Sequence, residues 1–369
     1  MSARIALVHE RFTEIAGSEH VVEQLAREWP DAPVHVPVSR PAGVPPGLEG
    51  RLHTSGVDHL YRLTGGRTYA PLTPLFPRAF RRMRLDPADA VVISHHAFAT
   101  QAAFATAAPT VAYVHSPARW AWETGMRAGE ASGRLGSAAL DALARITRRA
   151  ELAAAPRLTR IVANSHEVAR RVRAWWGRDA EVVHPPVDTE AFTPDPGTDR
   201  EDFFLLAGRL VPYKRPEIAI EAAREAGVRL VVVGEGRGEQ ACRRVAGPDV
   251  RFLGRVPHRE LLALHRRARA VLMPGVEDFG IVPVEAMACA TPVVALGQGG
   301  ALDSIAPGVT GVLVPPGDDE SVVAGFAEAL RGFDPGAFDP AAVRRHAESF
   351  SRAQFRSRMR RIVDDTAGV

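Results

Sequence analysis

The stretch from Val271 to Ile305 constrains the fold of this 369-residue chain more than any other. The apolar run Val271–Met273 is stopped by Pro274 and Gly275, which is typical of a buried strand followed by a loop. Pro283 suits the first turn of a helix, because its fixed φ fits there and its missing N–H would have no acceptor. The stretch therefore predicts a strand, a loop and a helix in succession.

The start of this predicted helix is suited to an anion. Its first N–H groups, from Gly280, Ile281 and Val282, would lack intrahelical acceptors and would face the preceding loop with the positive end of the helix dipole. With a phosphate there, Glu285 could accept hydrogen bonds from a ribose diol, and Glu277 could accept them from sugar hydroxyls. Carboxylates beside a diphosphate require cations to cover it, so we expect cations from another part of the chain.

Arg209 and Lys214 are the expected cations. They follow a predicted strand at 203–207, and Lys214 is the only lysine in the chain. An ammonium is a compact charge that fits between phosphate oxygens, whereas a guanidinium makes planar bidentate contacts. We therefore predict that both bind a diphosphate. The alternative is that an Arg-biased sequence kept one lysine by chance.

Length and composition favour a two-domain α/β protein. The hydrophobic fraction of 46% and the charged fraction of 24% exclude disorder, and no apolar run approaches the roughly 20 residues of a membrane helix. The chain opens directly on a strand-like segment, which predicts a cytoplasmic protein. Cys242 and Cys289 lack the spacing of a metal or redox motif and are expected to be buried thiols.

Strand-like and helical segments alternate along the chain, which predicts parallel, doubly wound sheets. The Pro, Asp and Gly cluster at Pro194–Thr198 is the predicted linker. We expect an acceptor-side domain at 1–190, a nucleotide-sugar domain at 191–350 and a terminal helix within 351–369. That helix has an apolar stripe with which it could dock across both domains: Phe355, Met359, Ile362 and Val363.

In the first domain, several residues are candidates for ligand contact. Gly17 would let a ligand approach the backbone before a helix that Ser18 is expected to cap. His96 and His115 follow strands, at the edge where such sheets bind ligands, although a histidine can equally bond the loop backbone. The next segment could stack on a sugar and bond its hydroxyls, or form a packed cap: Arg119, Trp120, Trp122 and Glu123.

The segment 59–85 combines six arginines with leucine and aromatic residues and has no acidic residue. It is a candidate for peripheral contact with anionic lipid at the inner face of the cell membrane, and a solvated Arg-rich loop is the alternative. Nucleic acid is not an expected partner, because no helix-turn-helix, zinc or RNA-binding motif is present. The glycines of Gly234–Gly238 resemble a dinucleotide-binding fingerprint, but Glu239 stands where its last glycine should be.

Several separate motifs coincide in this chain. They are the Glu277 and Glu285 pair, Gly208-Arg209 with Lys214, Asn164-Ser165, Pro185–Asp188 and the Gly17 loop. With them the chain resembles the retaining glycosyltransferases of family four, which implies a GT-B fold. In that fold two Rossmann-like, doubly wound α/β domains face a cleft, and a C-terminal helix crosses back to the N-terminal domain.

The segment from Tyr113 to Glu123 is similar to the O-antigen and exopolysaccharide mannosyltransferases, which implies GDP-mannose as the donor. The resemblance implies hexosyl transfer to a saccharide or lipid-linked acceptor, with Arg209, Lys214 and the amides from Phe279 to Val282 at the diphosphate. It implies that Glu285 binds the ribose, that Glu277 binds the donor sugar, and that His115 orients that sugar.

Two residues depart from the family pattern: Ala16 stands where a glycine is usual, and Asp303 where a glutamate is usual. No Asp-x-Asp motif occurs, so we expect no metal and no cofactor. Three alternatives stay open: a UDP- or dTDP-sugar donor, a nucleotide-sugar epimerase or sugar phosphorylase of the same fold, and a non-catalytic saccharide-binding protein.

Overall fold

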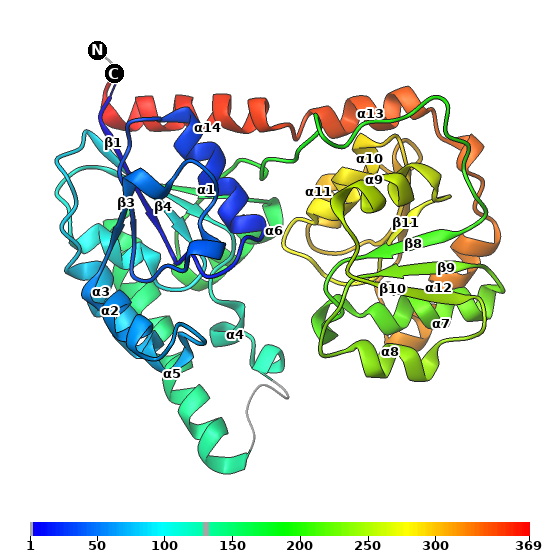
Figure 1. The fold of residues 1–369 in the computed structure, drawn as a ribbon, viewed down its shortest axis with the longest axis horizontal. Coiled ribbons are helices and arrows are strands. Elements are labelled where there is room, and N and C mark those ends of the chain that lie inside the picture. Colours follow the sequence, from blue (N-terminus) through cyan, green and yellow to red (C-terminus); the bar gives the residue numbers. More distant parts are fainter. Residues whose placement is uncertain (1–2, 128–132) are drawn as a thin grey trace. The chain divides into compact units, whose positions relative to one another are not determined.

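The structure is a computed structural model that describes residues 3–127 and 133–369. The chain divides into two compact units, of which the first comprises 1–186 with 353–369 and the second comprises 187–352. Each unit contains one parallel β-sheet with helices between its strands, as the alternation of segments predicts (Figure 1). Among the described residues, no helix is both long enough and apolar enough to cross a membrane.

The prediction that Pro194–Thr198 links the two domains is wrong. The boundary between the units lies between Pro186 and Val187, and Pro194–Thr198 is part of the second unit. Val187 and Phe192 are buried in the core of that unit. Its arginines also hold the segment: Arg344 donates to the carbonyl oxygen of Phe192 at 2.6 Å, and Arg266 to that of Thr193 at 2.7 Å. Composition alone did not reveal these contacts.

The first unit has seven strands in the order β3-β2-β1-β4-β5-β6-β7. Its strands are β1 (Ile5–His9), β2 (Val34–Val36), β3 (Leu52–Thr54), β4 (Ala90–His95), β5 (Thr110–Val114), β6 (Arg160–Ala163) and β7 (Glu181–Val182). Its helices are α1 (Gly17–Glu28), α2 (Gly56–Leu63), α3 (Phe76–Arg81), α4 (Arg119–Trp122), α5 (Gly133–Ala154) and α6 (His166–Trp176), with α14 (Arg352–Ala367) at the end of the chain.

The second unit has six strands in the order β10-β9-β8-β11-β12-β13. Its strands are β8 (Phe204–Ala207), β9 (Leu230–Val233), β10 (Val250–Gly254), β11 (Val271–Met273), β12 (Val293–Leu296) and β13 (Gly311–Val314). Its helices are α7 (Pro216–Ala226), α8 (Glu239–Val245), α9 (His258–Arg267), α10 (Ile281–Ala288), α11 (Ala301–Ser304), α12 (Asp319–Arg331) and α13 (Pro340–Glu348).

Local sequence determines where the helices begin and end. Ser165 caps α6, since its hydroxyl accepts a hydrogen bond from the Val168 amide at 3.1 Å, and Gly177 ends the helix at a φ of 65°. The start of α1 differs from the prediction. Its N-cap is Ala16, whose amide donates to the Glu19 carboxylate at 3.0 Å, so Ser18 lies inside the first turn.

The apolar stripe of α14 packs on the first unit, in a core that it shares with residues of β1, β2 and β5. The rings of Phe355 and Tyr113 lie 5.5 Å apart, edge to face. On its polar side α14 lies beside α1 (Figure 1), where Arg356 donates to Gln24 at 2.6 Å and Arg360 pairs with Glu28. The last helix of the chain thus belongs to the unit that contains the first strand.

Candidate functional site

Both sheets change winding direction between two central strands. In the second unit β8 continues outward to β9 and β10, whereas β11 continues the other way to β12 and β13. In the first unit β1 continues outward to β2 and β3, whereas β4 continues the other way to β5, β6 and β7. Ligands bind beyond the carboxyl ends of the strands at such a point. The predicted residues follow these strands in both units.

In the second unit the structure brings Lys214 and Glu277 together. Lys214 follows β8, Glu277 follows β11, and the Nζ–Oε1 distance is 2.6 Å. The two side chains are 24% and 19% exposed, so each remains accessible to a ligand. Arg209 donates to the Tyr213 hydroxyl at 3.1 Å. The only lysine is therefore adjacent to the loop that precedes the predicted anion site.

Glycines hold these loops in place. A Cβ on Gly275 would lie 2.6 Å from the Cα of Lys214, so only glycine lets the two backbones come this close. The Gly300 amide donates to the carbonyl oxygen of Glu277 at 2.9 Å, and a Cβ there would lie 2.2 Å from the Cα of Phe279. The loop after β12 therefore supports the loop that carries Glu277.

The partial dinucleotide fingerprint has a packing role. A Cβ on Gly234 would lie 1.9 Å from the carbonyl oxygen of Gly208, and one on Gly236 would lie 2.2 Å from that of Leu210. The Gly238 amide donates to the same Leu210 oxygen at 2.8 Å. These glycines thus position the loop that carries Arg209.

The start of α10 has the expected form. Gly280 is the N-cap, with a φ of 93°, and the first turn contains no acidic residue. Ile281 and Val282 therefore present amides that have no acceptor within the helix. The Phe279 side chain is buried, with its ring 5.4 Å from that of Phe350. Phe279 can thus reach a ligand only through its backbone.

Glu285 is a carboxylate without a hydrogen-bond donor, as far as the described residues go. Burial, and to a smaller extent the nearby Asp188 carboxylate, raise the pKa of Glu285 to about 7. Asp188 itself pairs with Arg352 at 2.8 Å. Glu285 is half-buried rather than sealed, so hydroxyl groups of a ligand could supply the missing donors.

At the corresponding edge of the first unit, His115 belongs to a chain of hydrogen bonds. Its Nε2 lies 2.8 Å from the Ser94 hydroxyl, which lies 3.0 Å from His9 Nδ1. His9 Nε2 lies 3.3 Å from Glu19 Oε1. The pKa of His115 is lowered to about 3, chiefly by burial and next by His9, against the opposing effect of Glu19.

His96 lies beside this chain. Its ring centroid is 5.7 Å from that of His115 and 6.0 Å from that of His9. Its Nε2 is buried without a hydrogen-bond partner in the described chain, and burial, with the charge of Arg11 next, lowers its pKa well below the usual value. A neutral imidazole has one donor and one acceptor nitrogen, so it can both donate to and accept from hydroxyl groups.

The aromatic segment after β5 is used largely in packing. The ring of Trp122 is stacked on that of Trp175 at 5.4 Å, and its indole N–H donates to Glu151 at 2.5 Å. Arg119 and Glu123 pair with each other at 3.3 Å. Trp120 is half-buried in the same cluster. These contacts favour the packed cap that the sequence left as an alternative.

Sequence reasoning missed His9, Glu19 and Ser94. All three are at most 4% exposed. His9 ends β1 and Ser94 lies in β4, so the rule that selected His96 and His115 could have selected them too. Gly17, which was predicted to contact a ligand, is the first residue of α1. It follows Ala16, whose amide donates a hydrogen bond to the Glu19 carboxylate.

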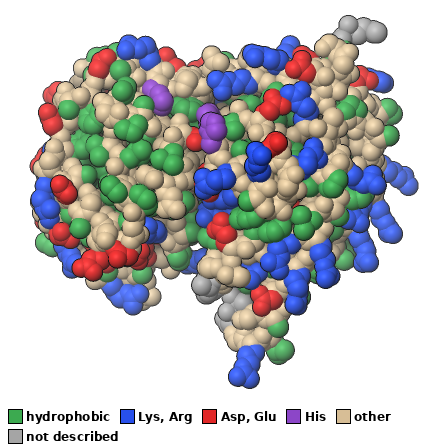
Figure 2. Space-filling model, turned by 180° about the vertical axis from the view of Figure 1, so that it is seen from behind, with side chains coloured by type: hydrophobic (Ala, Val, Ile, Leu, Met, Phe, Trp, Pro, Cys, Tyr) green, Lys and Arg blue, Asp and Glu red, His purple; other side chains and the backbone are tan. Residues whose placement is uncertain are grey.

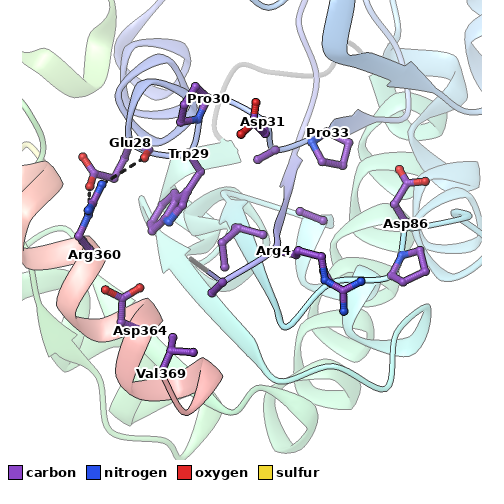
Figure 3. A pocket seen from close by; sticks show the side chains of 16 residues that line it. Arg4, Glu28, Trp29, Pro30, Asp31, Pro33, Asp86, Arg360, Asp364 and Val369 are labelled. Atoms are coloured by element: carbon purple, nitrogen blue, oxygen red, sulfur yellow. Dashed lines mark hydrogen bonds and ion pairs between the residues drawn. The ribbon is translucent and has the colours of Figure 1, made fainter. Parts of the chain in front are cut away.

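A pocket of about 700 Å³ lies elsewhere in the first unit, at the amino end of β1 (Figure 3). Trp29 and Asp31 line one side of it, and Arg360 and Asp364 of α14 line another. Its arginines have partners already: Arg4 pairs with Asp89 at 3.1 Å, and Arg360 with Glu28. The pocket is at the wrong end of the strands for a ligand site of this fold.

The described structure is similar over almost its full length to solved glycosyltransferases. Anabaena HepE in complex with UDP matches with a TM-score of 0.70 and 19% identity, over 98% of this chain and 100% of that one. Sucrose-phosphate synthase from Thermosynechococcus elongatus matches with a TM-score of 0.71 and 18% identity, over 98% of each chain. The fold is therefore GT-B, as predicted.

Sequence relatives point to the same group of enzymes. The D-inositol 3-phosphate glycosyltransferase of Kribbella flavida is 37% identical over 229 residues, which cover 52% of this chain and 53% of that protein. Its Mycobacterium tuberculosis counterpart is 36% identical over 183 residues, 42% of this chain and 37% of that protein. The chain thus spans about half the length of the first of these relatives, and less of the second.

Two family models match consecutive parts of the chain. Glycosyltransferase Family 4 matches residues 15–191, and Glycosyl transferases group 1 matches residues 188–334. The two ranges meet near the boundary between the units, so each model covers most of one sheet and its helices, whereas β1, α13 and α14 lie outside them. The chain is accordingly a GT-B protein whose first unit belongs to glycosyltransferase family 4 and whose second belongs to the group 1 glycosyltransferases.

Proposed function

We propose that the protein transfers a hexose from a nucleoside diphosphate sugar to a saccharide or lipid-linked acceptor, with retention of configuration. The observation that carries the proposal is the second unit's switch point. There Lys214 approaches within 2.6 Å of Glu277, beside a helix start without acidic residues and a carboxylate, Glu285, that lacks a donor. One anion, one ribose diol and one sugar would satisfy these three features.

Each group has a role in this proposal. Arg209, Lys214 and the amides of Ile281 and Val282 stabilise the diphosphate as the glycosidic bond breaks, so the leaving group needs no metal. Glu285 accepts hydrogen bonds from the ribose. The acceptor oxygen attacks from the face that the diphosphate leaves, and a phosphate oxygen takes its proton, so no protein base is required.

The donor that we propose first is GDP-mannose, on the resemblance of Tyr113–Glu123 to mannosyltransferases. A UDP-sugar is the second candidate, because the HepE structures contain UDP. The described residues supply no contact that selects guanine over uracil. The nucleoside diphosphate itself therefore has to be varied in the test.

Calorimetric titration with GDP, UDP, dTDP and NAD, each with EDTA, tests the proposal. We expect one nucleoside diphosphate to bind without metal and to lose affinity in Lys214→Ala and in Glu285→Ala. Arg243→Ala is the matched control, since it removes a cation of α8 that pairs with Glu239 and lies over the Phe252 ring, and that has no role in the proposed site. Binding of NAD alone, or equal loss in the control, would contradict the transferase assignment.

We further propose that the segment 59–85 contacts anionic lipid. Three of its four aromatic residues do not contribute as the sequence suggested, because Tyr61, Phe76 and Phe80 are buried in the core, whereas Tyr69 is half-buried. Leu63 is 71% exposed and Leu60 is 44% exposed, close to exposed arginines. On the face seen in Figure 2, Lys and Arg side chains are likewise interspersed with hydrophobic ones.

Sedimentation with anionic liposomes tests this contact. Replacing the exposed arginines of the segment with glutamine should reduce the bound fraction, and should have no effect with neutral liposomes. Equal sedimentation of the wild-type and substituted chains would exclude the contact.

A further inference from the structure

The hydrogen bonds around His115 form one directed chain within the first unit. Glu19 accepts from the Ala16 amide and the Ser18 hydroxyl, both at 3.0 Å, through Oε2. Its other oxygen faces His9 Nε2 at 3.3 Å. Ser94 then connects His9 Nδ1, at 3.0 Å, with His115 Nε2, at 2.8 Å. The loop before α1 is thereby linked to His115.

The carboxylate at one end fixes the direction of each bond. Burial favours a protonated Glu19, but His9, the backbone amide of Glu19 and the Ser18 hydroxyl outweigh burial and lower the pKa of Glu19 to about 2. An ionised carboxylate only accepts, so His9 must carry a proton on Nε2. At a pH at which the His9 ring carries no second proton, Nδ1 then accepts from the Ser94 hydroxyl.

The serine transmits this direction to His115. A serine hydroxyl has one proton, and Ser94 donates this proton in its hydrogen bond to His9. Its oxygen can therefore only accept from His115, which places the His115 proton on Nε2. Because His115 is half-buried rather than sealed, Nδ1 of its neutral ring is left as an acceptor for a hydroxyl group.

We propose that Glu19, His9 and Ser94 are positioning residues that set the tautomer of His115, so that its Nδ1 accepts a hydrogen bond from a sugar hydroxyl. The identity of the ligand in this proposal rests on the proposed function. The tautomer of His115 is independent of that function. A purely structural role would need the bonds only for packing and would leave the tautomer of His115 free.

Nitrogen-15 NMR of the full-length chain, with labelled histidine, tests the proposal. Long-range proton–nitrogen spectra are recorded at a pH at which the His9 signals are those of a neutral ring. They show which ring nitrogen of His115 carries the proton, and loss of signals in His115→Gln identifies His115. We expect Nε2–H in the wild type and in Ser94→Thr, which keeps the hydroxyl. In Ser94→Ala and in His9→Phe, which keeps a ring, we expect a mixture with Nδ1–H. Thr147→Ala is the control, because this buried hydroxyl bonds only its own helix, at 2.9 Å from the Leu143 oxygen.

Activity gives a second readout. Once a donor is identified, Ser94→Ala should lower kcat by about threefold to tenfold, the usual effect of one hydrogen bond, and Ser94→Thr should restore it. A wild-type His115 with Nδ1–H, or an unchanged tautomer in both Ser94→Ala and His9→Phe, would overturn the proposal. Absence of transfer with every donor, combined with the expected spectra, would overturn only the proposed function.

Discussion

Replacing Glu285 with glutamine should stabilise the second unit at neutral pH and weaken its binding of a nucleoside diphosphate. The pKa of Glu285 rises from its ordinary value of 4.5 to about 7 in the folded chain. Between these values the folded state binds more protons than the unfolded state, so the free energy of unfolding falls as the pH rises. Above pH 7 the loss amounts to about 3 kcal/mol, which a neutral glutamine would avoid.

Urea unfolding at several pH values measures this difference. The free energy of unfolding of Glu285→Gln should exceed that of the wild type by less than about 0.5 kcal/mol at pH 4.5, and by about 3 kcal/mol at pH 8. Glu328→Gln is the control, because it removes an exposed carboxylate of the same unit. Substitutions at such surface positions change stability by at most about 0.5 kcal/mol.

Glu285→Gln should also lower the affinity of the chain for a nucleoside diphosphate. Ribose hydroxyls would donate to the charged form of Glu285, so the ligand should bind more tightly as the pH rises toward 7. Loss of hydrogen bonds to a charged group typically reduces affinity by about tenfold to a hundredfold. If wild type and Glu285→Gln kept a constant difference in stability from pH 4.5 to 8, the carboxylate would not be desolvated and this argument would be refuted.

Three further predictions follow from the two units. Acetylation of amines should weaken nucleoside diphosphate binding by about tenfold to a hundredfold, because Lys214 is the only lysine, and Lys214→Arg should resist the reagent in the same titration. Gly275→Ala should lower the melting temperature, since its Cβ would meet the Lys214 backbone at 2.6 Å, whereas Gly197→Ala, with 3.6 Å to a side chain, should not. The pKa of His115, about 3, lies below the ordinary 6.5, so stability is lost as the pH falls through this range, and acid titration of His115→Asn should show a smaller loss.

Much of the second unit could be predicted from the sequence. β11 has the predicted bounds, Val271–Met273, because Pro274 and Gly275 stop its apolar run. β3 could not be predicted in the same way. It is a three-residue edge strand whose side chains are half-buried or exposed, so it has no apolar run. Edge strands are defined by the neighbour they pair with rather than by their own pattern.

The candidate site was predictable where its chemistry lies within one motif. Glu277, the α10 start and Glu285 are consecutive in the chain, so one strand-loop-helix segment contains them. The contact of Lys214 with Glu277 depends instead on β8 pairing with β11, which is a long-range property. The chain from Glu19 to His115 likewise requires the pairings of β1 with β4 and of β4 with β5.

The two units share a topology, but their helix starts differ in charge, and this difference supports the different ligands that we propose for them. At α10 the first turn has no acidic residue, and Lys214 lies in the adjoining loops. At α1 the carboxylate of Glu19 already accepts from the Ala16 amide and occupies the positive end of the helix. A phosphate at α1 would be repelled by that carboxylate, whereas a hydroxyl group would not be. A charge difference within one turn of helix therefore favours phosphate in the second unit and sugar hydroxyls in the first.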